Sequence, residues 1–263
     1  MTVTSKENPQ VKKWRQLSAD GRTRRKENAF AVEGARLCHD AAVSGVCITV
    51  LLYTETAKTQ YAEAFGAIAA VAEGTMEIAD ALAKYMSQTT TPQGMFCICK
   101  MPTHPLSVET LSPNGRYLAL EDVRDPANVG TVIRTAEALG LDGILLSAGC
   151  CDLYNPKVLR GSMGGVFRLP FAVMDYVPAD IALLRDKGFC AYACVPDSSA
   201  VSICDIPLKD GAICFIGNEA NGLTQETIAA CDTVVTIPMA GRAESLNAAM
   251  AAGIVMWEMK RGN

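Results

Sequence analysis

The stretch VVTIPMAGRAESLNAAMAAG, residues 234–253, joins a strand to a helix through a long polar loop. The β-branched strand ends at Ile237-Pro238-Met239, and a loop with one glycine follows. We expect Ser245 at the N-cap of the next helix and Asn247 within its first turn. That helix is nearly all Ala, Met, Ile and Val, so we expect it to be buried in the fold or against another subunit. A capped core helix explains Ser245, but not the whole loop, whose backbone N–H and C=O groups could bind a purine or a carboxylate.

Strand and helix patterns alternate through the whole second half of the chain, from about residue 115 onward. The apolar runs RYLALED (116–122), GILLSA (143–148) and AICFIG (212–217) read as strands between helical segments. This alternation predicts an α/β fold with a mostly parallel sheet that is covered on both faces. Ligands of such sheets bind beyond the carboxyl ends of the strands, where the polar loops fall.

A second polar loop lies within LEDVRDPANVGTVIRTAEALG, residues 120–140. Pro126 and Gly130 shape a turn, and Asn128 precedes the expected helix and could cap it. Arg134 sits among small and apolar residues, and the packing of the helix does not require it. By itself, Arg134 is better explained by a surface position on a partly exposed helix than by a function.

A third polar loop is FIGNEANGL, residues 215–223, where an apolar strand runs into Gly217. A glycine at a strand end lets a ligand approach the backbone closely. The ordinary alternative is a simple strand-to-helix turn that exposes Glu219.

In chain order the three loops read N-x-G-x-x-x-R, G-N-E-x-x-G-L and I-P-M-x-G-x-x-x-S-L-N. This combination resembles the three motifs of the SpoU/TrmH family, the RNA ribose 2′-O-methyltransferases of the SPOUT superfamily. The resemblance spans residues 115–261, and RGSMGGVFRLP (160–170) is similar to the segment between the first two motifs. The first half resembles, more weakly, an L30e-like substrate-binding domain, through RRKENAFAVEG (24–34) and TTTPQGMF (89–96).

The resemblance implies a domain organisation. It predicts a small α/β, L30e-like RNA substrate-binding domain over residues 1–103 and a linker over 104–114, which is rich in proline. Residues 115–263 then form a SPOUT methyltransferase domain with a deep trefoil knot. Family members are usually homodimers that place the first motif of one subunit near the cofactor of the other, and the apolar 248–257 helix would suit such an interface.

The resemblance also assigns residues to S-adenosylmethionine and to catalysis. The cofactor would be held, largely by backbone groups, at Gly217, Ile237, Pro238, Met239, Leu246 and Ala248. The polar catalytic positions are Arg134, Asn128, Glu219, Ser245 and Asn247. An arginine is a poor base because its pKa exceeds about 12, so we expect Arg134 to orient the ribose or a phosphate and to stabilise negative charge on oxygen. The other four would position the substrate and Arg134.

The charge of the chain is unevenly distributed. The formal net charge is -4, yet residues 1–30 contain eight Lys/Arg against three Asp/Glu. A basic arm on an acidic body is compatible with RNA binding, and a solvated surface helix is the alternative. We expect RNA contacts from Arg22, Arg24, Arg25, Arg160 and Arg168.

Cysteine usage and hydropathy limit the remaining classes. The eleven cysteines include no CxxC pair, which favours reduced thiols in a cytoplasmic protein over a metal site or a disulfide framework. No apolar run is long enough for a membrane span, and the polar N-terminus is not a secretory signal.

The function that the sequence predicts is S-adenosylmethionine-dependent methylation of a ribose 2′-hydroxyl in RNA. The additional N-terminal domain favours a large folded RNA, and therefore 23S-type rRNA. The alternatives are a tRNA ribose 2′-O-methyltransferase and a non-catalytic RNA-binding or ribosome-assembly protein of the same fold. A nicotinamide-dependent oxidoreductase is disfavoured, because no GxGxxG follows the first strand of either half.

Overall fold

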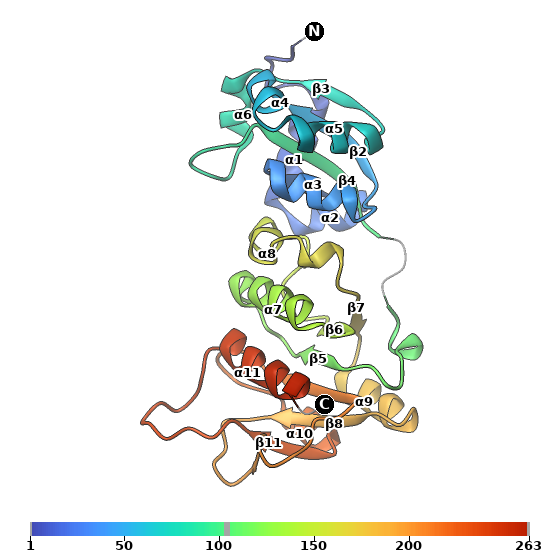
Figure 1. Cartoon of the computed structure of the whole chain (residues 1–263), viewed down its shortest axis with the longest axis vertical. Helices are drawn as coiled ribbons and strands as arrows, with labels where there is room; N and C mark the ends of the chain where they lie inside the picture. The colour runs from blue at the N-terminus through green and yellow to red at the C-terminus, as the bar shows by residue number, and fades with distance from the viewer. Residues whose placement is uncertain (1, 103–105, 262–263) are drawn as a thin grey trace. The chain divides into compact units, whose positions relative to one another are not determined.

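The computed structural model describes residues 2–102 and 106–261 (Figure 1). The chain divides into two compact units, Met1–Thr103 with Asp152–Phe167 and His104–Cys151 with Arg168–Asn263. Residues 152–167, which we expected in the second domain, therefore pack in the first unit. Of the expected linker, residues 104 and 105 lie outside the described residues, and Val108–Thr110 forms a short 3-10 helix, η1.

The first unit is built on a four-stranded mixed sheet of order β1-β4-β2-β3, in which β4 pairs antiparallel with β1 and β2. Its strands are β1 (Ala29–Glu33), β2 (Ile48–Tyr53), β3 (Thr75–Glu77) and β4 (Met95–Lys100). Its helices are α1 (Pro9–Ala19), α2 (Gly21–Glu27), α3 (Ala35–Val43), α4 (Glu55–Gln60), α5 (Ala62–Val71), α6 (Asp80–Met86) and α8 (Pro156–Gly161), with η2 (Gly165–Phe167). Trp14 of α1 packs edge-on against Phe96, with ring centroids 5.0 Å apart, in the core beneath α1.

Residues 152–167 contact the rest of the first unit through stacked aromatic rings and a charged pair. Tyr154 stacks on Phe30 of β1, with ring centroids 4.4 Å apart. Arg24 of α2 donates from Nε to Asp152 Oδ2 at 2.7 Å and from Nη1 to the Leu17 carbonyl at 2.7 Å. The contacts of Tyr154 and Asp152 join segments more than a hundred positions apart, which local sequence patterns cannot reveal.

The second unit contains a seven-stranded sheet of order β7-β6-β5-β10-β8-β11-β9, in which every neighbouring pair is parallel. This confirms the predicted parallel sheet. Its strands are β5 (Tyr117–Leu120), β6 (Gly143–Ser147), β7 (Phe171–Met174), β8 (Cys190–Cys194), β9 (Val201–Ser202), β10 (Ala212–Ile216) and β11 (Thr233–Thr236). Its helices are α7 (Pro126–Leu139), α9 (Val177–Asp186), α10 (Gln225–Ala230) and α11 (Ala248–Arg261).

Helices cover both faces of the central strands. Every residue of β5, β6 and β10 is buried, as expected for parallel strands with helices on each side. Helices α7 and α11 lie side by side (Figure 1), and α9 packs against α10. Because the strands are parallel, the loops after β5, β8, β10 and β11 meet at one edge of the sheet.

No helix in the described part of the chain is long and apolar enough to cross a bilayer.

Candidate functional site

Three predicted site residues from three different loops are joined by hydrogen bonds at the carboxyl edge of the second sheet. Asn247 Nδ2 donates to Asn128 Oδ1 at 3.0 Å. Asn128 Nδ2 in turn donates to Glu219 Oε1 at 2.8 Å. The sequence separations are 119 and 91 residues, so only the parallel sheet brings these side chains together.

Asn128 does not cap its helix, contrary to our prediction. Helix α7 begins at Pro126, and its N-cap is Asp125, whose carboxylate accepts a hydrogen bond from the Ala127 N–H at 2.8 Å. Asn128 lies in the first turn and is 6% exposed. Its amide is therefore available to bond the other two loops instead of its own backbone.

The predicted cap at Ser245 is also wrong, because the following helix begins later. Asn247 is the capping side chain of α11: its Oδ1 accepts from Ala249 N at 2.9 Å and from Met250 N at 3.3 Å. Ser245 lies two residues earlier and is exposed. The Asn247 side chain thus caps α11 through its oxygen and hydrogen-bonds Asn128 through its nitrogen.

The loop after β10 is closed so tightly that only glycine fits at its start. A Cβ on Gly217 would lie 2.1 Å from the carbonyl carbon of Gly222. Asn218 and Gly222 exchange both backbone hydrogen bonds, at 3.0 and 2.9 Å. The side chain of Asn218 also donates to the Asp122 carbonyl at 2.7 Å, which ties this loop to the one after β5. Asn218 is not among the predicted site residues, although it stands inside the G-N-E pattern.

The Glu219 carboxylate is held in its ionised form. Partial burial raises its pKa, but hydrogen bonds from the Asn128 side chain and from the backbone N–H groups of Glu219, Arg124 and Asp125 outweigh that effect. The net result is a pKa below the usual value. Glu219 is therefore an acceptor at neutral pH, suited to orienting a neighbouring donor.

A cavity of about 810 Å³ opens beside this cluster, between the loops that follow β8, β10 and β11. Of the six predicted cofactor residues, all but Pro238 line this cavity. The five are Gly217, Ile237, Met239, Leu246 and Ala248. Glu219 and Ser245 line it as well. The volume and the combination of apolar walls with backbone-rich loops suit a small amphiphilic molecule such as S-adenosylmethionine.

One wall of this cavity was not predicted. It is formed by the loop after β8, which includes Pro196, Asp197 and Ser199. The Asp197 carboxylate accepts hydrogen bonds from the backbone N–H and the hydroxyl of Ser199, at 2.8 and 2.7 Å. The turn-forming sequence PDSS directly after a strand was the available signal.

Arg134 lies on α7 but outside the Asn128 cluster. The two residues are six positions apart, which rotates Arg134 by about 240° around the helix axis from Asn128. Arg134 is exposed, and in the described part of the chain no hydrogen bond or ion pair engages it. On the neighbouring helix α11, Met250 and Trp257 are 62% and 56% exposed. An unengaged arginine thus belongs to a helix pair that exposes large apolar side chains.

The five predicted RNA-contacting arginines have different environments. Arg22 and Arg25 are exposed on α2. The prediction for Arg24 is wrong, because this side chain is 4% exposed and is engaged with Asp152 and Leu17. Arg168 pairs with Glu137 at 2.8 Å and lowers the pKa of that carboxyl. Arg160 lines a separate cavity in the first unit.

The described residues contain no group of three or more His, Cys, Asp or Glu that could hold a metal ion. The eleven cysteines are free thiols. Burial raises the pKa of the Cys38, Cys97 and Cys99 thiols, so these three remain protonated at neutral pH.

Comparison with known proteins adds relatives of the whole chain. Residues 115–257 match the SpoU rRNA Methylase family, and residues 8–97 match the MRM3-like substrate binding domain. The 23S rRNA (guanosine(2553)-2′-O)-methyltransferase RlmP of Bacillus subtilis is 31% identical over 98% of both chains. The 23S rRNA (uridine(2479)-2′-O)-methyltransferase of Streptomyces viridochromogenes is 29% identical over 98% of this chain and 91% of its own. The AdoMet-bound rRNA methyltransferase from Sinorhizobium meliloti has a TM-score of 0.88 at 31% identity, over 99% of this chain and 97% of that one.

Proposed function

The chain belongs to the SpoU rRNA methylase family, and on that premise we propose that it transfers a methyl group from S-adenosylmethionine to a ribose 2′-hydroxyl of a 23S-type rRNA. The predicted family resemblance is thereby confirmed, including its substrate-binding half. The observation that carries the proposal is the Asn247–Asn128–Glu219 chain of hydrogen bonds at the rim of the 810 Å³ cavity.

The cavity residues present the cofactor to the substrate. Bound S-adenosylmethionine supplies an electrophilic methyl group. The loops at Gly217, Ile237–Met239 and Leu246–Ala248 hold it, mainly through backbone N–H and C=O groups. The deep trefoil knot is part of this proposal, and the likeness in fold to the S. meliloti enzyme supports it.

The polar cluster has a positioning role. Asn128 and Asn247 use their amides on each other and on Glu219, so together they hold the Glu219 carboxylate at the cavity wall. Fixed polar groups lower a barrier by presenting the reacting hydroxyl at the right distance and angle. Ser245 is exposed at the cavity mouth, where its hydroxyl can contact the ribose.

Arg134 completes the site in a homodimer. Within its own chain it points away from Asn128, so Arg134 of the partner subunit approaches the cofactor cavity instead. The exposed apolar face of α11, next to α7, supports this arrangement because it offers a contact surface for a second copy. There the guanidinium orients the ribose or a phosphate and stabilises the negative charge that develops on O2′. An RNA phosphate or water takes the proton.

RNA contacts come from both units in this proposal. The exposed Arg22 and Arg25 on α2, together with Arg168, supply positive charge to the phosphate backbone. A cytoplasmic location, which the reduced cysteines favour, also belongs to the proposal.

A methyl-transfer assay tests the function. Ribosomal RNA and tRNA from cells that lack the gene are incubated with the protein and methyl-labelled S-adenosylmethionine, and the modified ribose is mapped. We expect labelling of one 2′-oxygen in the large rRNA, and loss of about 100-fold or more of the activity in Arg134→Ala with unchanged cofactor affinity. Lys209→Ala removes an exposed cation just before β10, at the opposite edge of the sheet, and should retain activity. Labelling of tRNA alone would reassign the substrate, and full activity of Arg134→Ala would remove Arg134 from the site.

A further inference from the structure

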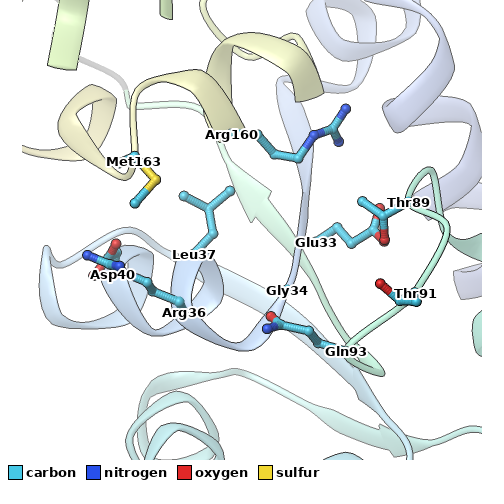
Figure 2. A pocket seen from close by; sticks show the side chains of 10 residues that line it. All are labelled: Glu33, Gly34, Arg36, Leu37, Asp40, Thr89, Thr91, Gln93, Arg160 and Met163. Carbon is cyan, nitrogen blue, oxygen red and sulfur yellow. The ribbon is translucent and has the colours of Figure 1, made fainter. Parts of the chain in front are cut away.

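The first unit contains a cavity of its own, of about 390 Å³. It lies where the end of β1, the start of α3, the loop between α6 and β4, and the end of α8 come together (Figure 2). All of these segments belong to the first unit. The cavity is within the size range of small-molecule sites and more than ten times the ~30 Å³ that one water molecule occupies in the liquid.

Two acceptors of this cavity, the Glu33 carboxylate and Gln93 Oε1, are already engaged within the protein. Glu33 accepts from the Ser87 hydroxyl, from the Thr89 hydroxyl at 3.0 Å and from the Gln88 N–H at 3.0 Å. Figure 2 shows Glu33 directed toward Thr89. Gln93 Oε1 accepts from the Ala35 N–H at 2.8 Å, at the first turn of α3. A Cβ on Gly34 would approach that oxygen to 3.0 Å, so the glycine keeps this contact open.

The donors, in contrast, are left open. Arg160 Nη1 is buried, and no residue among 2–102 and 106–261 hydrogen-bonds it. Among the described residues, no ion pair engages Arg160 or Arg36, and no bond is made by the Thr91 hydroxyl or Gln93 Nε2. A buried cationic N–H without an acceptor costs free energy in the folded protein, so its presence indicates an acceptor that arrives from outside.

The composition of the walls identifies the kind of acceptor. Two arginines, Arg36 and Arg160, are balanced by two carboxylates, Glu33 and Asp40, so the formal charges cancel. A site for a bare phosphate would exclude carboxylates, because like charges repel. Leu37 and Met163, both labelled in Figure 2, supply apolar side chains to the lining. An apolar surface beside open arginine donors and the Asp40 carboxylate matches an unpaired nucleobase, which has flat apolar faces and an edge that carries both acceptors and donors.

We infer that this cavity receives one unstacked nucleotide of the RNA with its base inward, and that Arg160 donates to an acceptor on the base edge. The inference rests on the proposed function, because the RNA is the substrate named there. Arg160 of α8 and Met163 lie inside the span that matches the methylase family, whereas the other lining residues lie within the substrate-binding match. Both parts of the chain therefore contribute to reading the same nucleotide.

The first test measures the stability and kinetics of two variants in which a cationic residue of α8 is replaced by methionine. Arg160→Met removes the unpaired guanidinium, and Lys157→Met removes an exposed cation from the same helix. For Arg160→Met we expect KM for the rRNA to rise about tenfold or more, with kcat and cofactor affinity within about twofold and Tm unchanged or higher. Lys157→Met should leave KM within about twofold. The inference would be overturned if KM rose equally in the two variants and both increases became smaller with added salt. That result would mean that each cation attracts the RNA only through its charge.

A second measurement separates the base from the phosphate. In the full chain labelled with 13C-methyl methionine, the Met163 resonance, assigned with Met163→Leu, is followed while ligands are added. We expect it to shift with at least one of the four ribonucleoside 5′-monophosphates, and not with inorganic phosphate or ribose 5-phosphate at the same concentration. A response to phosphate alone, or to none of these probes, would overturn the inference. If the wild type transferred no methyl group to any RNA, the proposed function would fail instead, whatever the Met163 resonance showed.

Discussion

Two cavities of this molecule contrast in how their polar groups are engaged. Around the 810 Å³ cavity of the second unit, Asn128, Glu219 and Asn247 bond one another and the loop backbones. Around the 390 Å³ cavity of the first unit, Arg160 retains a buried N–H without a partner. The first arrangement holds loops in place before a ligand arrives, as our proposal of cofactor binding by backbone groups requires. The second leaves side-chain donors open, so the ligand itself must complete their hydrogen bonding.

The largest effect should come from the closed loop of the second cavity. A Cβ at Gly217 would lie 2.1 Å from the carbonyl carbon of Gly222 and 2.2 Å from Leu223 N, and these backbone atoms cannot move aside without opening the loop. We expect Gly217→Ala to weaken S-adenosylmethionine binding by about 100-fold or more, or roughly 3 kcal/mol, in isothermal titration calorimetry. Gly241→Ala is the matched control, since nothing lies within 4 Å of its Cβ. Similar affinities for the two variants would show that the cofactor does not depend on this closure.

In the first unit, loss of the partner of a paired arginine should lower the free energy of unfolding more than removal of an unpaired arginine. Asp152→Ala leaves Arg24, 4% exposed, without the carboxylate that its Nε bonds at 2.7 Å. We expect this change to lower the free energy of unfolding by about 3 kcal/mol, because a buried charge loses its partner. Arg160→Met removes no such pair and should change it by less than about 0.5 kcal/mol.

The measurement follows Trp14 fluorescence in urea, in a Trp257→Phe background, since Trp14 is 1% exposed in the core of the first unit. Comparable losses in the two variants would mean that Arg160 supports the fold, and would contradict the contrast between the arginines.

The carboxylate that supports the second cavity should have a smaller effect. Glu121, 6% exposed at the end of β5, accepts from the Thr224 N–H at 2.9 Å and from the Thr227 hydroxyl at 2.6 Å. Glu121→Gln places an NH₂ donor where donors already point, so we expect a loss of about 2 kcal/mol in scanning calorimetry. The control is Glu226→Gln, because Glu226 is exposed and lies on α10, the helix that contains Thr227. If the two variants melt alike, the bonds to Glu121 do not hold α10 in place.

The regular part of the fold was predictable, and the caps were not. Alternating strand and helix patterns predicted the parallel sheet, and the three loops were found at its carboxyl edge because such edges carry polar loops. Asn128 was misassigned because its partner lies 91 residues away, whereas Asp125 before Pro126 was the better local capping signal.

The inward-facing arginine of α2 could not be identified from the sequence for a similar reason. Three arginines stand within four positions of this seven-residue helix, and their local patterns are alike. Only the contact with Asp152, 128 positions away, decides that Arg24 is buried while Arg22 and Arg25 are exposed. The same long-range contact places residues 152–167 in the first unit. Strand β9, with two residues, is too short to give a period.

The smallest effect should be the pH dependence that comes from Glu219. Its folded pKa lies below the ordinary value of 4.5, so it contributes stability above about pH 4.5 that is lost as the pH falls through the folded pKa. The contribution is at most ~1 kcal/mol, because the side chain is exposed and water screens it. We expect the difference in unfolding free energy between the wild type and Glu219→Gln to shrink from pH 6 to pH 3.

In Asn128→Leu, burial acts without the side-chain hydrogen bond, so the Glu219 pKa measured by 13C NMR should rise. If Asn128→Leu leaves the Glu219 pKa unchanged, the backbone N–H groups of Arg124 and Asp125 keep the carboxylate ionised. The cavity of the second unit would then rely on backbone donors even to hold the side chain of Glu219.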